Sequence, residues 1–212
     1  MKILHVLDHS LPLQDGYAYR SQNKFRVKRK MGLTQIIITT PKHQKSWKGE
    51  WKSLEEIDGF RLYRTAAIPQ AFNPIVTESH LLAALCIRLN EVIKIEKPDV
   101  IHAHSPILNA LPALTIGRMH GIPIVYEIRA FWEDAGADQG TYVQNDLKYR
   151  IVRFVETMIC RLADQVSTIC NGIKDDLIKR GIAHEKLTVA FNGVDSEGFS
   201  VCEPDEEYML SW

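Results

Sequence analysis

The sequence predicts an α/β fold: a doubly wound, mostly parallel β-sheet with helices on both faces. Short apolar runs alternate along the chain with longer segments in which apolar residues recur at helical spacing. This alternation is typical of βαβ units, whose strands pair in parallel and whose helices cover both faces of the sheet. The 212 residues are 45% hydrophobic and 25% charged, an ordinary balance for a chain that buries a sizeable core.

The expected elements follow one another in a regular order. Residues 3–7 form the first apolar run, and a second run, which contains Ile36-Ile37-Ile38, ends at Pro41. Residues 75–96 carry apolar side chains at helical spacing until Pro98 breaks the helix. The expected strands are 3–7, 34–40, 59–65, 100–103, 122–128, 166–170 and 187–191, and the expected helices are 17–31, 75–96, 106–120 and 146–163. We expect 41–58 and 130–145 to be irregular connections.

Charge and cysteine content argue against several classes of protein. The 26 basic and 26 acidic residues cancel, so no global field favours nucleic acid as a partner. The four cysteines form no C-x-x-C pair, which argues against a zinc or redox site. No segment approaches the roughly 20 apolar residues that span a bilayer, and the first apolar run is too short for a signal peptide. We therefore expect a cytoplasmic location.

The loop after the first strand is the first candidate site, because ligands of open parallel sheets bind outside the carboxyl ends of the strands. This loop runs from His9 to Gly16 and contains neither the G-x-G-x-x-G fingerprint nor a P-loop. In one interpretation, Asp15-Gly16 makes a tight turn and caps the following helix. In the other, Gly16 lets a phosphate approach the backbone N–H groups.

A pair of histidines lies at the end of the strand expected at 100–103. His102 and His104 are two positions apart and therefore point to the same face of the strand, with His104 at its carboxyl end. We expect His102 to be structural, whereas His104 is either packed or functional. No carboxylate cluster accompanies the pair in the sequence, so we expect no metal site.

Polar and aromatic residues also follow the strand expected at 122–128. Glu127 and Arg129 share one strand face, and Phe131 and Trp132 come directly after them. The first two residues form either a structural ion pair or a polar wall for a hydroxylated substrate. In the second interpretation, the aromatic side chains offer a face to a sugar ring.

A basic segment covers the first expected helix. Residues 20–30 contain six basic residues and no acidic residue, and lysines interleave with two tryptophans in 42–52. The segment is either a solvated helix face or a surface that meets anionic lipid, where tryptophan is also favoured. The candidates for membrane contact are Arg20, Lys24, Arg26, Lys28, Trp47 and Trp51.

Taken together, these segments resemble retaining GT-B glycosyltransferases of family four. The matching stretches are Lys2-Ile3-Leu4-His5-Val6 with Gly16, Asp99-Val100-Ile101-His102-Ala103-His104, Val166-Ser167-Thr168-Ile169-Cys170 with Asp176-Leu177, and Asn192-Gly193-Val194-Asp195 with Phe199. The last stretch is similar to the signature between the two domains of that family. Residues 7–17 most resemble the branch associated with bacterial exosortase (PEP-CTERM) and exopolysaccharide loci.

The resemblance implies a Rossmann-like acceptor-side domain at 1–192 and an interdomain linker at 193–212, with the C-terminal donor domain absent. It implies transfer from a UDP- or GDP-sugar to a glycan or lipid-linked acceptor, with retention and without a cofactor or metal. The implied donor-phosphate residues are Asp15, Gly16 and Tyr17, the catalytic residue is His104, and the acceptor-side residues are Glu127, Arg129 and Trp132. Many members carry two adjacent glycines where this chain has Asp15-Gly16, which weakens the phosphate assignment.

The resemblance also bears on the activity and location of the whole protein. We expect this chain alone to be inactive, and we expect His104→Ala in the whole enzyme to lower turnover while leaving folding largely intact. A lipid-linked acceptor would place the protein peripherally at the inner membrane. The alternatives are a non-catalytic sugar- or lipid-binding module and another Rossmann-like sugar-nucleotide enzyme, although the missing G-x-G-x-x-G counts against the latter.

Overall fold

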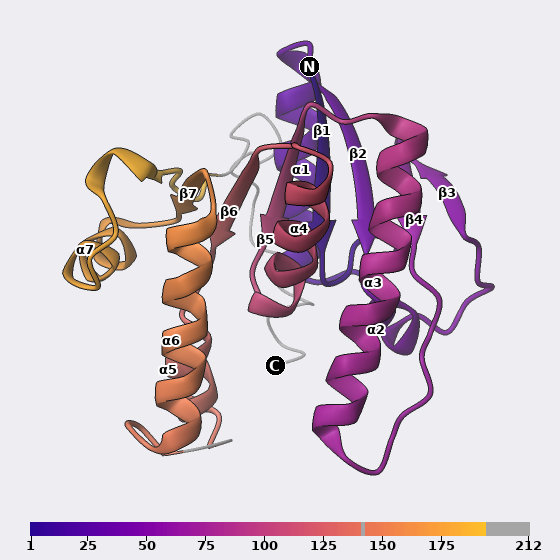
Figure 1. The fold of residues 1–212 in the computed structure, drawn as a ribbon. Helices are drawn as coiled ribbons and strands as arrows, with labels where there is room; N and C mark the ends of the chain where they lie inside the picture. Colours follow the sequence, from indigo (N-terminus) through magenta and orange to yellow (C-terminus); the bar gives the residue numbers. More distant parts are fainter. Residues whose placement is uncertain (141–142, 194–212) are drawn as a thin grey trace, which may run out of the picture.

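The computed structural model describes residues 1–140 and 143–193, and the structural statements below refer to them. One sheet contains eight strands in the order β3-β4-β2-β1-β5-β6-β7-β8, and every neighbouring pair is parallel except β3 and β4 (Figure 1). The strands are β1 (Lys2–Leu7), β2 (Thr34–Thr39), β3 (Leu54–Ile57), β4 (Phe60–Arg64), β5 (Val100–His104), β6 (Ile124–Ile128), β7 (Gln165–Thr168) and β8 (Leu187–Val189).

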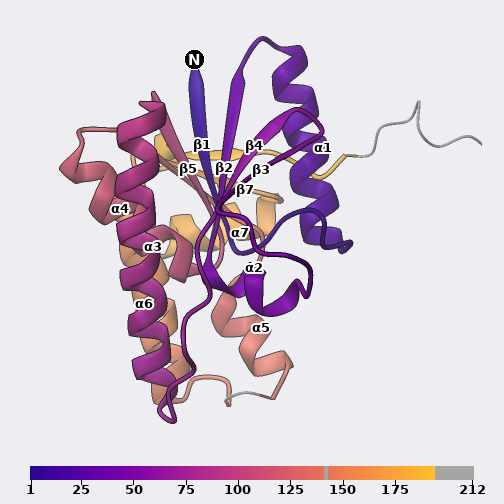
Figure 2. The ribbon, with the colours of Figure 1, turned by 90° about the vertical axis from the view of Figure 1, so that its right-hand side faces the viewer.

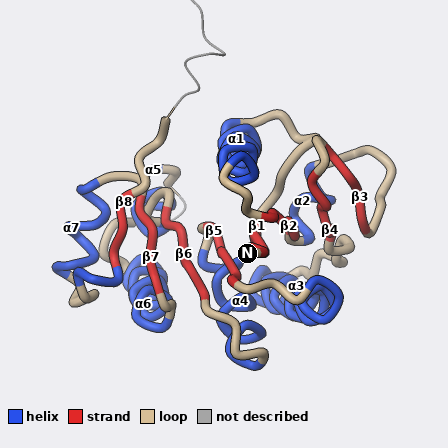
Figure 3. The backbone as a smooth tube through the Cα atoms, turned by 90° about the horizontal axis from the view of Figure 1, so that it is seen from above, coloured by secondary structure: helices blue, strands red, loops and turns tan. Residues whose placement is uncertain are grey.

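Helices cover both faces of this sheet, as the sequence predicted. They are α1 (Gly16–Lys30), α2 (Pro41–Ser46), α3 (Pro74–Glu96), α4 (Ile107–Met119), α5 (Trp132–Asp138), α6 (Leu147–Leu162) and α7 (Asn171–Lys179), and a 3₁₀ turn spans His184–Lys186. Figures 2 and 3 show α1 on one side of the sheet and α3, α4 and α6 on the other. The doubly wound α/β class is therefore confirmed. The linker expected at 193–212 lies almost entirely outside the described residues.

The two connections expected to be irregular contain three regular elements, and that expectation was wrong. Thr40 caps α2 by accepting a hydrogen bond from the backbone of Lys42, with Pro41 in the first turn of the helix. β3 and β4 form an antiparallel hairpin around Asp58-Gly59, whose φ angles of 54° and 71° suit a tight two-residue turn. The third element, α5, begins at Trp132.

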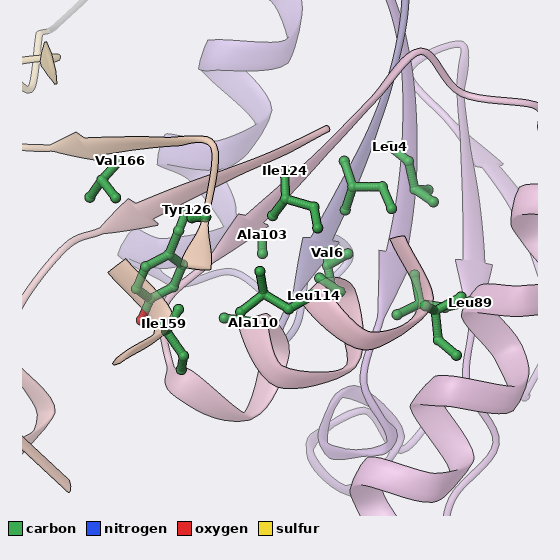
Figure 4. Packing of buried hydrophobic residues seen from close by; sticks show 14 of the residues in the cluster. Leu4, Val6, Leu89, Ala103, Ala110, Leu114, Ile124, Tyr126, Ile159 and Val166 are labelled. Carbon is green, nitrogen blue, oxygen red and sulfur yellow. The ribbon is translucent and has the colours of Figure 1, made fainter. Parts of the chain in front are cut away.

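The larger core lies between the sheet and the layer formed by α3, α4 and α6. Alternate strand residues such as Leu4, Ala103 and Tyr126 point into it and meet Leu89 and Ile159 from the helices (Figure 4). A smaller cluster of Leu7, Phe25, Ile37, Phe60 and Leu62 lies under α1 on the opposite face. Burial of these apolar side chains is the main favourable contribution to folding.

A buried polar cluster joins α5, α6 and α7 at the edge of the larger core. Glu156 on α6 accepts a hydrogen bond from the Tyr126 hydroxyl at 2.8 Å. Glu133 on α5 pairs with Arg180 at 2.7 Å, and the Arg180 guanidinium lies over the Phe131 ring. Burial, followed by the charge of Glu133, raises the pKa of Glu156 to about 8, so Glu156 is mostly protonated near neutral pH.

The strand order places the topological switch point between β1 and β5. From β1 the chain proceeds outward to β2 and β4, whereas from β5 it proceeds in the other direction to β6, β7 and β8. The loops that follow β1 and β5 therefore diverge at the carboxyl edge of the sheet, where doubly wound folds bind their ligands. None of the described helices is both long and apolar enough to cross a bilayer.

Candidate functional site

Three buried histidines lie on the face of the sheet that α1 covers. His5 on β1 is in register with His102 on β5, and His104 follows two positions later. The rings of His102 and His104 stack with centroids 4.3 Å apart, and the His5 ring lies 5.1 and 5.3 Å from them. The strand face expected to be shared by His102 and His104 is confirmed, and the cluster bridges the two strands at the switch point.

A chain of hydrogen bonds assigns the proton positions in this cluster. The Arg129 guanidinium is only a donor, and its Nη2 lies 2.9 Å from Nδ1 of His104, which therefore accepts. Nε2 of His104 then donates to Nδ1 of His5 at 3.0 Å, and Nε2 of His5 donates to the Gln35 side-chain oxygen at 2.7 Å. Burial is the largest cause that lowers the pKa of both His5 and His104 well below the usual value, so both rings are neutral.

Glu127 carries the negative charge of the site. Its side chain is 2% exposed, and Oε1 accepts hydrogen bonds from Lys24 Nζ at 2.8 Å and Arg129 Nε at 3.0 Å. Oε2 lies 3.4 Å from Nε2 of His102. Burial opposes ionisation, but the surrounding donors Lys24, Arg129 and His102 outweigh it and hold the pKa of Glu127 well below its usual range. The ion pair between Glu127 and Arg129, one of the two interpretations, is present, whereas the polar wall for a substrate stays a prediction.

Three basic side chains of α1 turn toward the sheet. Arg20, Lys24 and Lys28 are four residues apart and therefore lie on one side of the helix. Arg20 lies 3.7 Å from the Glu127 carboxylate, and Lys28 Nζ lies 3.3 Å from Nδ1 of His102. The interpretation of residues 20–30 as a solvated helix face, one of the two that the sequence left open, does not hold for these three residues, because a buried carboxylate and an imidazole face them.

The other residues predicted to contact a membrane lie outside this cluster. Arg26 is exposed and forms an ion pair with Asp58. Trp51 is exposed, whereas Trp47 is half-buried with its ring against Gly49. Membrane contact through the three inward-facing basic residues of α1 would require them to leave their partners. The contact predicted for Arg26, Trp47 and Trp51 stays a prediction.

A groove of about 1260 Å³ lies beside the histidine cluster, between α1 and the strands. The strands line the groove with the apolar residues Ile3, Val100 and Val125 and with the polar residues His102 and Glu127 of the cluster. Where α1 lines it, its surface is basic and includes Lys24 and Lys28. The groove therefore combines a floor of mixed polarity with a positively charged wall.

The loop after β1 holds a second polar cluster at the carboxyl edge. Nε2 of His9 lies 2.6 Å from Asp15, Nδ1 lies 3.4 Å from Asp8, and Asp8 in turn pairs with Lys42 at 3.1 Å. Burial lowers the pKa of His9, but Asp8 and Asp15 outweigh it and the pKa is raised. A half-buried imidazole that readily becomes positively charged therefore lies at the edge where a ligand would enter.

The predicted donor-phosphate residues form the first turn of α1. The Asp15 side chain accepts a hydrogen bond from the backbone of Ala18 at 2.8 Å, so the capping interpretation is confirmed. A Cβ at Gly16 would meet no atom within 4 Å, so packing does not require glycine there and the backbone is open to approach. The Tyr17 ring lies 4.2 Å from the Arg129 guanidinium, which connects this turn to the Glu127 carboxylate and the histidine cluster.

The predicted catalytic and acceptor residues differ in their exposure. Trp132 at the start of α5 is exposed, whereas His104 is 0% exposed and both of its ring nitrogens are engaged. Contact between His104 and a substrate therefore requires the side chains around it to move. Its burial also argues against the expectation that His104→Ala leaves folding intact, because the change removes a hydrogen-bond partner from Arg129 and from His5.

Sequence reasoning missed His5, Gln35 and His9 as members of these clusters. His5 lies in the first apolar run, and its pairing with His102 depends on strand register that the sequence does not state. The four-residue spacing of the basic residues on α1 was a readable signal, because it places them on one side of the helix.

The histidine cluster also has the composition of a metal site. His5, His102 and His104 carry ring nitrogens that all lie within 4.8 Å of one another. The nitrogens of His5 and His104 already form the hydrogen-bond chain from Arg129 to Gln35, which a metal ion would have to replace. The arrangement therefore fits a neutral hydrogen-bonded cluster better than a set of metal ligands.

Fold and site together define the class of protein: a Rossmann-like domain of the GT-B type, with its polar cluster at the switch point. The chain is similar in structure to sucrose-phosphate synthase from Thermosynechococcus elongatus, with a TM-score of 0.71 and 12% identity over 100% of this chain and 53% of that chain. It is also similar to UDP-GlcNAc 2-epimerase from Neisseria meningitidis bound to UDP-GlcNAc, with a TM-score of 0.59 and 15% identity over 91% of this chain and 46% of that chain. These likenesses show the fold alone.

The chain belongs to Glycosyltransferase Family 4, whose family model matches residues 29–197. It is 31% identical over 189 residues to the sulfoquinovosyl transferase SQD2 of Arabidopsis thaliana, covering 87% of this chain and 33% of that protein. The chain thus spans about a third of the length of this curated relative. The resemblance to family four is confirmed, whereas placement in the exosortase-associated branch stays a prediction.

Proposed function

We propose that this chain is the acceptor-binding N-terminal domain of a retaining glycosyltransferase that moves a sugar from a UDP- or GDP-sugar to a glycan or lipid-linked acceptor. The observation that carries the proposal is the cluster beside the switch point, in a chain of Glycosyltransferase Family 4. There, four cationic side chains surround one carboxylate: Arg20, Lys24, Lys28 and Arg129 around Glu127. Such an excess of positive charge stabilises the negative charge that builds on a departing diphosphate.

The proposed donor contact lies at the first turn of α1. Its support is the open backbone at Gly16, beside the imidazole of His9 and the ring of Tyr17. Backbone N–H groups at a helix N-terminus bind phosphate oxygens. Asp15 already caps this helix, so a phosphate would bind beside its carboxylate and benefit from a protonated His9.

The proposed acceptor wall consists of Glu127, Arg129 and Trp132. Trp132 is exposed at the start of α5, and Glu127 orients Arg129 through a buried ion pair. We assign His104 a positioning role in this state, because it contacts the Arg129 guanidinium and has no exposed surface of its own. Residues 7–17 support an exopolysaccharide acceptor through their resemblance to the exosortase-associated branch.

The test uses the gene product that contains residues 1–212, incubated with a panel of UDP- and GDP-sugars and glycan or lipid-linked acceptors. Nucleotide release measures turnover, and NMR of the product gives the anomeric configuration. We expect transfer with retention, and an inverted product would refute the mechanism. Epimerised sugar nucleotide without transfer would instead favour the epimerase alternative, and sugar binding without any turnover would favour a binding module.

The role of His104 is tested in the same assay by comparing how a substitution changes kcat and how it changes KM. We expect His104→Gln to lower kcat more than it changes KM for the donor, because the variant alters how Arg129 is held and leaves the first turn of α1 intact. Unchanged kcat in a folded variant would remove the positioning role. The unfolding midpoint of each variant separates loss of function from loss of fold.

A further inference from the structure

The outward face of α6 carries an apolar stripe. Leu147, Ile151, Phe154 and Leu162 are between 53% and 74% exposed. At 3.6 residues per turn, the four side chains fall within an arc of about 80° on the helix surface. The inward face of the same helix is already packed, with Ile159 and Cys160 in the larger core. The stripe is therefore a second apolar face, and it does not contribute to that core.

Basic residues border this stripe on both sides. By helical position, Arg150 and Arg161 lie along one edge, and Lys148 lies along the other. The only acidic residue within α6, Glu156, is fully buried. Exposed lysine and arginine at the border of an apolar helical stripe are typical of helices that lie in the plane of a membrane interface.

The acidic side chains near the start of α6 do not lie on the stripe. Asp146 precedes the helix and caps it by accepting a hydrogen bond from the backbone of Tyr149 at 2.7 Å. Asp134 and Asp138 belong to α5, and Asp134 accepts a hydrogen bond from the Tyr149 hydroxyl. Because Tyr149 lies on the inward side of α6, Asp134 lies on that side as well.

The position of α6 relates this face to the carboxyl edge of the sheet. α5 and α6 extend together beyond the carboxyl ends of the strands, on the same side as the loops of the candidate site (Figure 1). α6 belongs to the layer opposite α1 (Figures 2 and 3), so the stripe is separate from the basic residues of α1. The 16 residues of α6 form a rod of about 24 Å, long enough to lie along a membrane surface.

We propose that the outward face of α6 docks on the interface of an anionic lipid bilayer, with Leu147, Ile151, Phe154 and Leu162 inserted among the lipids and the flanking basic side chains at the head groups. An anionic bilayer fits this face by charge complementarity. The basic border of the stripe matches the anionic head groups, and its apolar centre matches the lipid chains. Docking in this way holds the carboxyl edge of the sheet next to the membrane. The proposal concerns lipid binding alone and does not depend on sugar transfer.

The test is co-sedimentation of the 212-residue chain with vesicles of phosphatidylcholine alone or of phosphatidylcholine mixed with phosphatidylglycerol. We expect binding to the mixed vesicles that weakens with added salt. The double variant Ile151→Glu/Phe154→Glu should lose about tenfold or more in apparent affinity, because both side chains leave the apolar interface. The matched control, Val27→Glu/Met31→Glu, adds the same charge at exposed positions on or next to α1 and should bind like the unchanged chain.

Several results would overturn the proposal. The first is the absence of salt-sensitive binding to the mixed vesicles. The second is that the α1 control variant loses binding while the α6 variant retains it, because this result would place the contact on α1. A dimer in sedimentation velocity without vesicles, dissociated by the α6 substitutions, would assign the stripe to a second copy of the chain. Circular dichroism of both variants checks that the fold is intact. Since no donor is present, a negative result leaves the proposed glycosyl transfer untouched.

Discussion

Replacing Glu127 with glutamine is the sharpest test of how this buried carboxylate and the basic side chains around it stabilise one another. The carboxylate faces the cationic side chains of Arg20, Lys24, Lys28 and Arg129. Four positive charges and one negative charge give the cluster a net charge of +3, and glutamine raises it to +4. The amide keeps the size of the side chain and can still accept a hydrogen bond, so the change is chiefly one of charge.

The magnitude follows from the burial of the pair. Removing one partner of a buried ion pair destabilises a protein by about 3–5 kcal/mol, because the remaining charges lose their compensation. Lys24 and Arg20 are each 23% exposed, so they can turn partly toward water, and we therefore expect the low end of that range. Arg129 has less freedom, because its side chain is 8% exposed and also contacts His104.

The assay is urea unfolding followed by circular dichroism, with and without inorganic phosphate. We expect Glu127→Gln to lower the free energy of unfolding by about 3 kcal/mol, and phosphate to restore part of the loss by binding the uncompensated cations. The matched control is Glu91→Gln, which breaks an exposed pair with Arg88 and should change stability by less than about 1 kcal/mol. Equal stability of Glu127→Gln and the unchanged chain would refute the electrostatic account.

Three further predictions concern other parts of the fold. The pKa of Glu156 is raised to about 8, so the folded state retains a proton that the unfolded state releases, and stability should fall as the pH rises from about 4.5 to 8, by about 1 kcal/mol per pH unit. In Glu156→Gln the contribution of Glu156 to this fall should disappear, and denaturation at several pH values measures the difference. Gly16→Ala should leave stability within about 0.5 kcal/mol of the unchanged chain, because the new methyl group meets no neighbour. In the proposed glycosyltransferase the same change should raise KM for the nucleotide sugar, and a normal KM would remove Gly16 from the proposed donor site. Leu89→Ala should cost about 2–5 kcal/mol in urea unfolding, because the side chain is fully buried in the larger core, and a smaller loss would mean that the core closes around the cavity.

The elements of the fold were largely predictable from local patterns. Apolar runs such as Ile36-Ile37-Ile38 are long enough to specify buried strands, and Asn73-Pro74 provides both a cap and a first-turn proline for α3. The strand at 59–65 was predicted, but its hairpin partner β3 was missed although Asp58-Gly59 is a strong turn signal, because β3 is short and half-exposed. The sequence pattern does not specify which strands become neighbours, and the switch point follows from that order.

The site was predictable only where its geometry is local. Glu127 and Arg129 share a strand face because side chains alternate along a strand, and that pair is present. The contact between Lys24 and Glu127 joins positions 103 residues apart and depends on where α1 crosses the sheet. Composition alone made the basic residues of α1 look like a surface, whereas packing against the sheet makes three of them part of the site.

The hydrogen bond between His5 and His104 joins residues 99 positions apart, and this separation bears on how the protein assembles. β2, the β3–β4 hairpin and α3 all lie between these two residues in the sequence, so the contact forms only after that whole segment has looped out and β5 has reached β1. Contacts of such high sequence separation carry a large loop-closure entropy and form slowly. We therefore expect the histidine cluster to be completed late in folding, when the two halves of the sheet meet, and a probe at His5 would report that step.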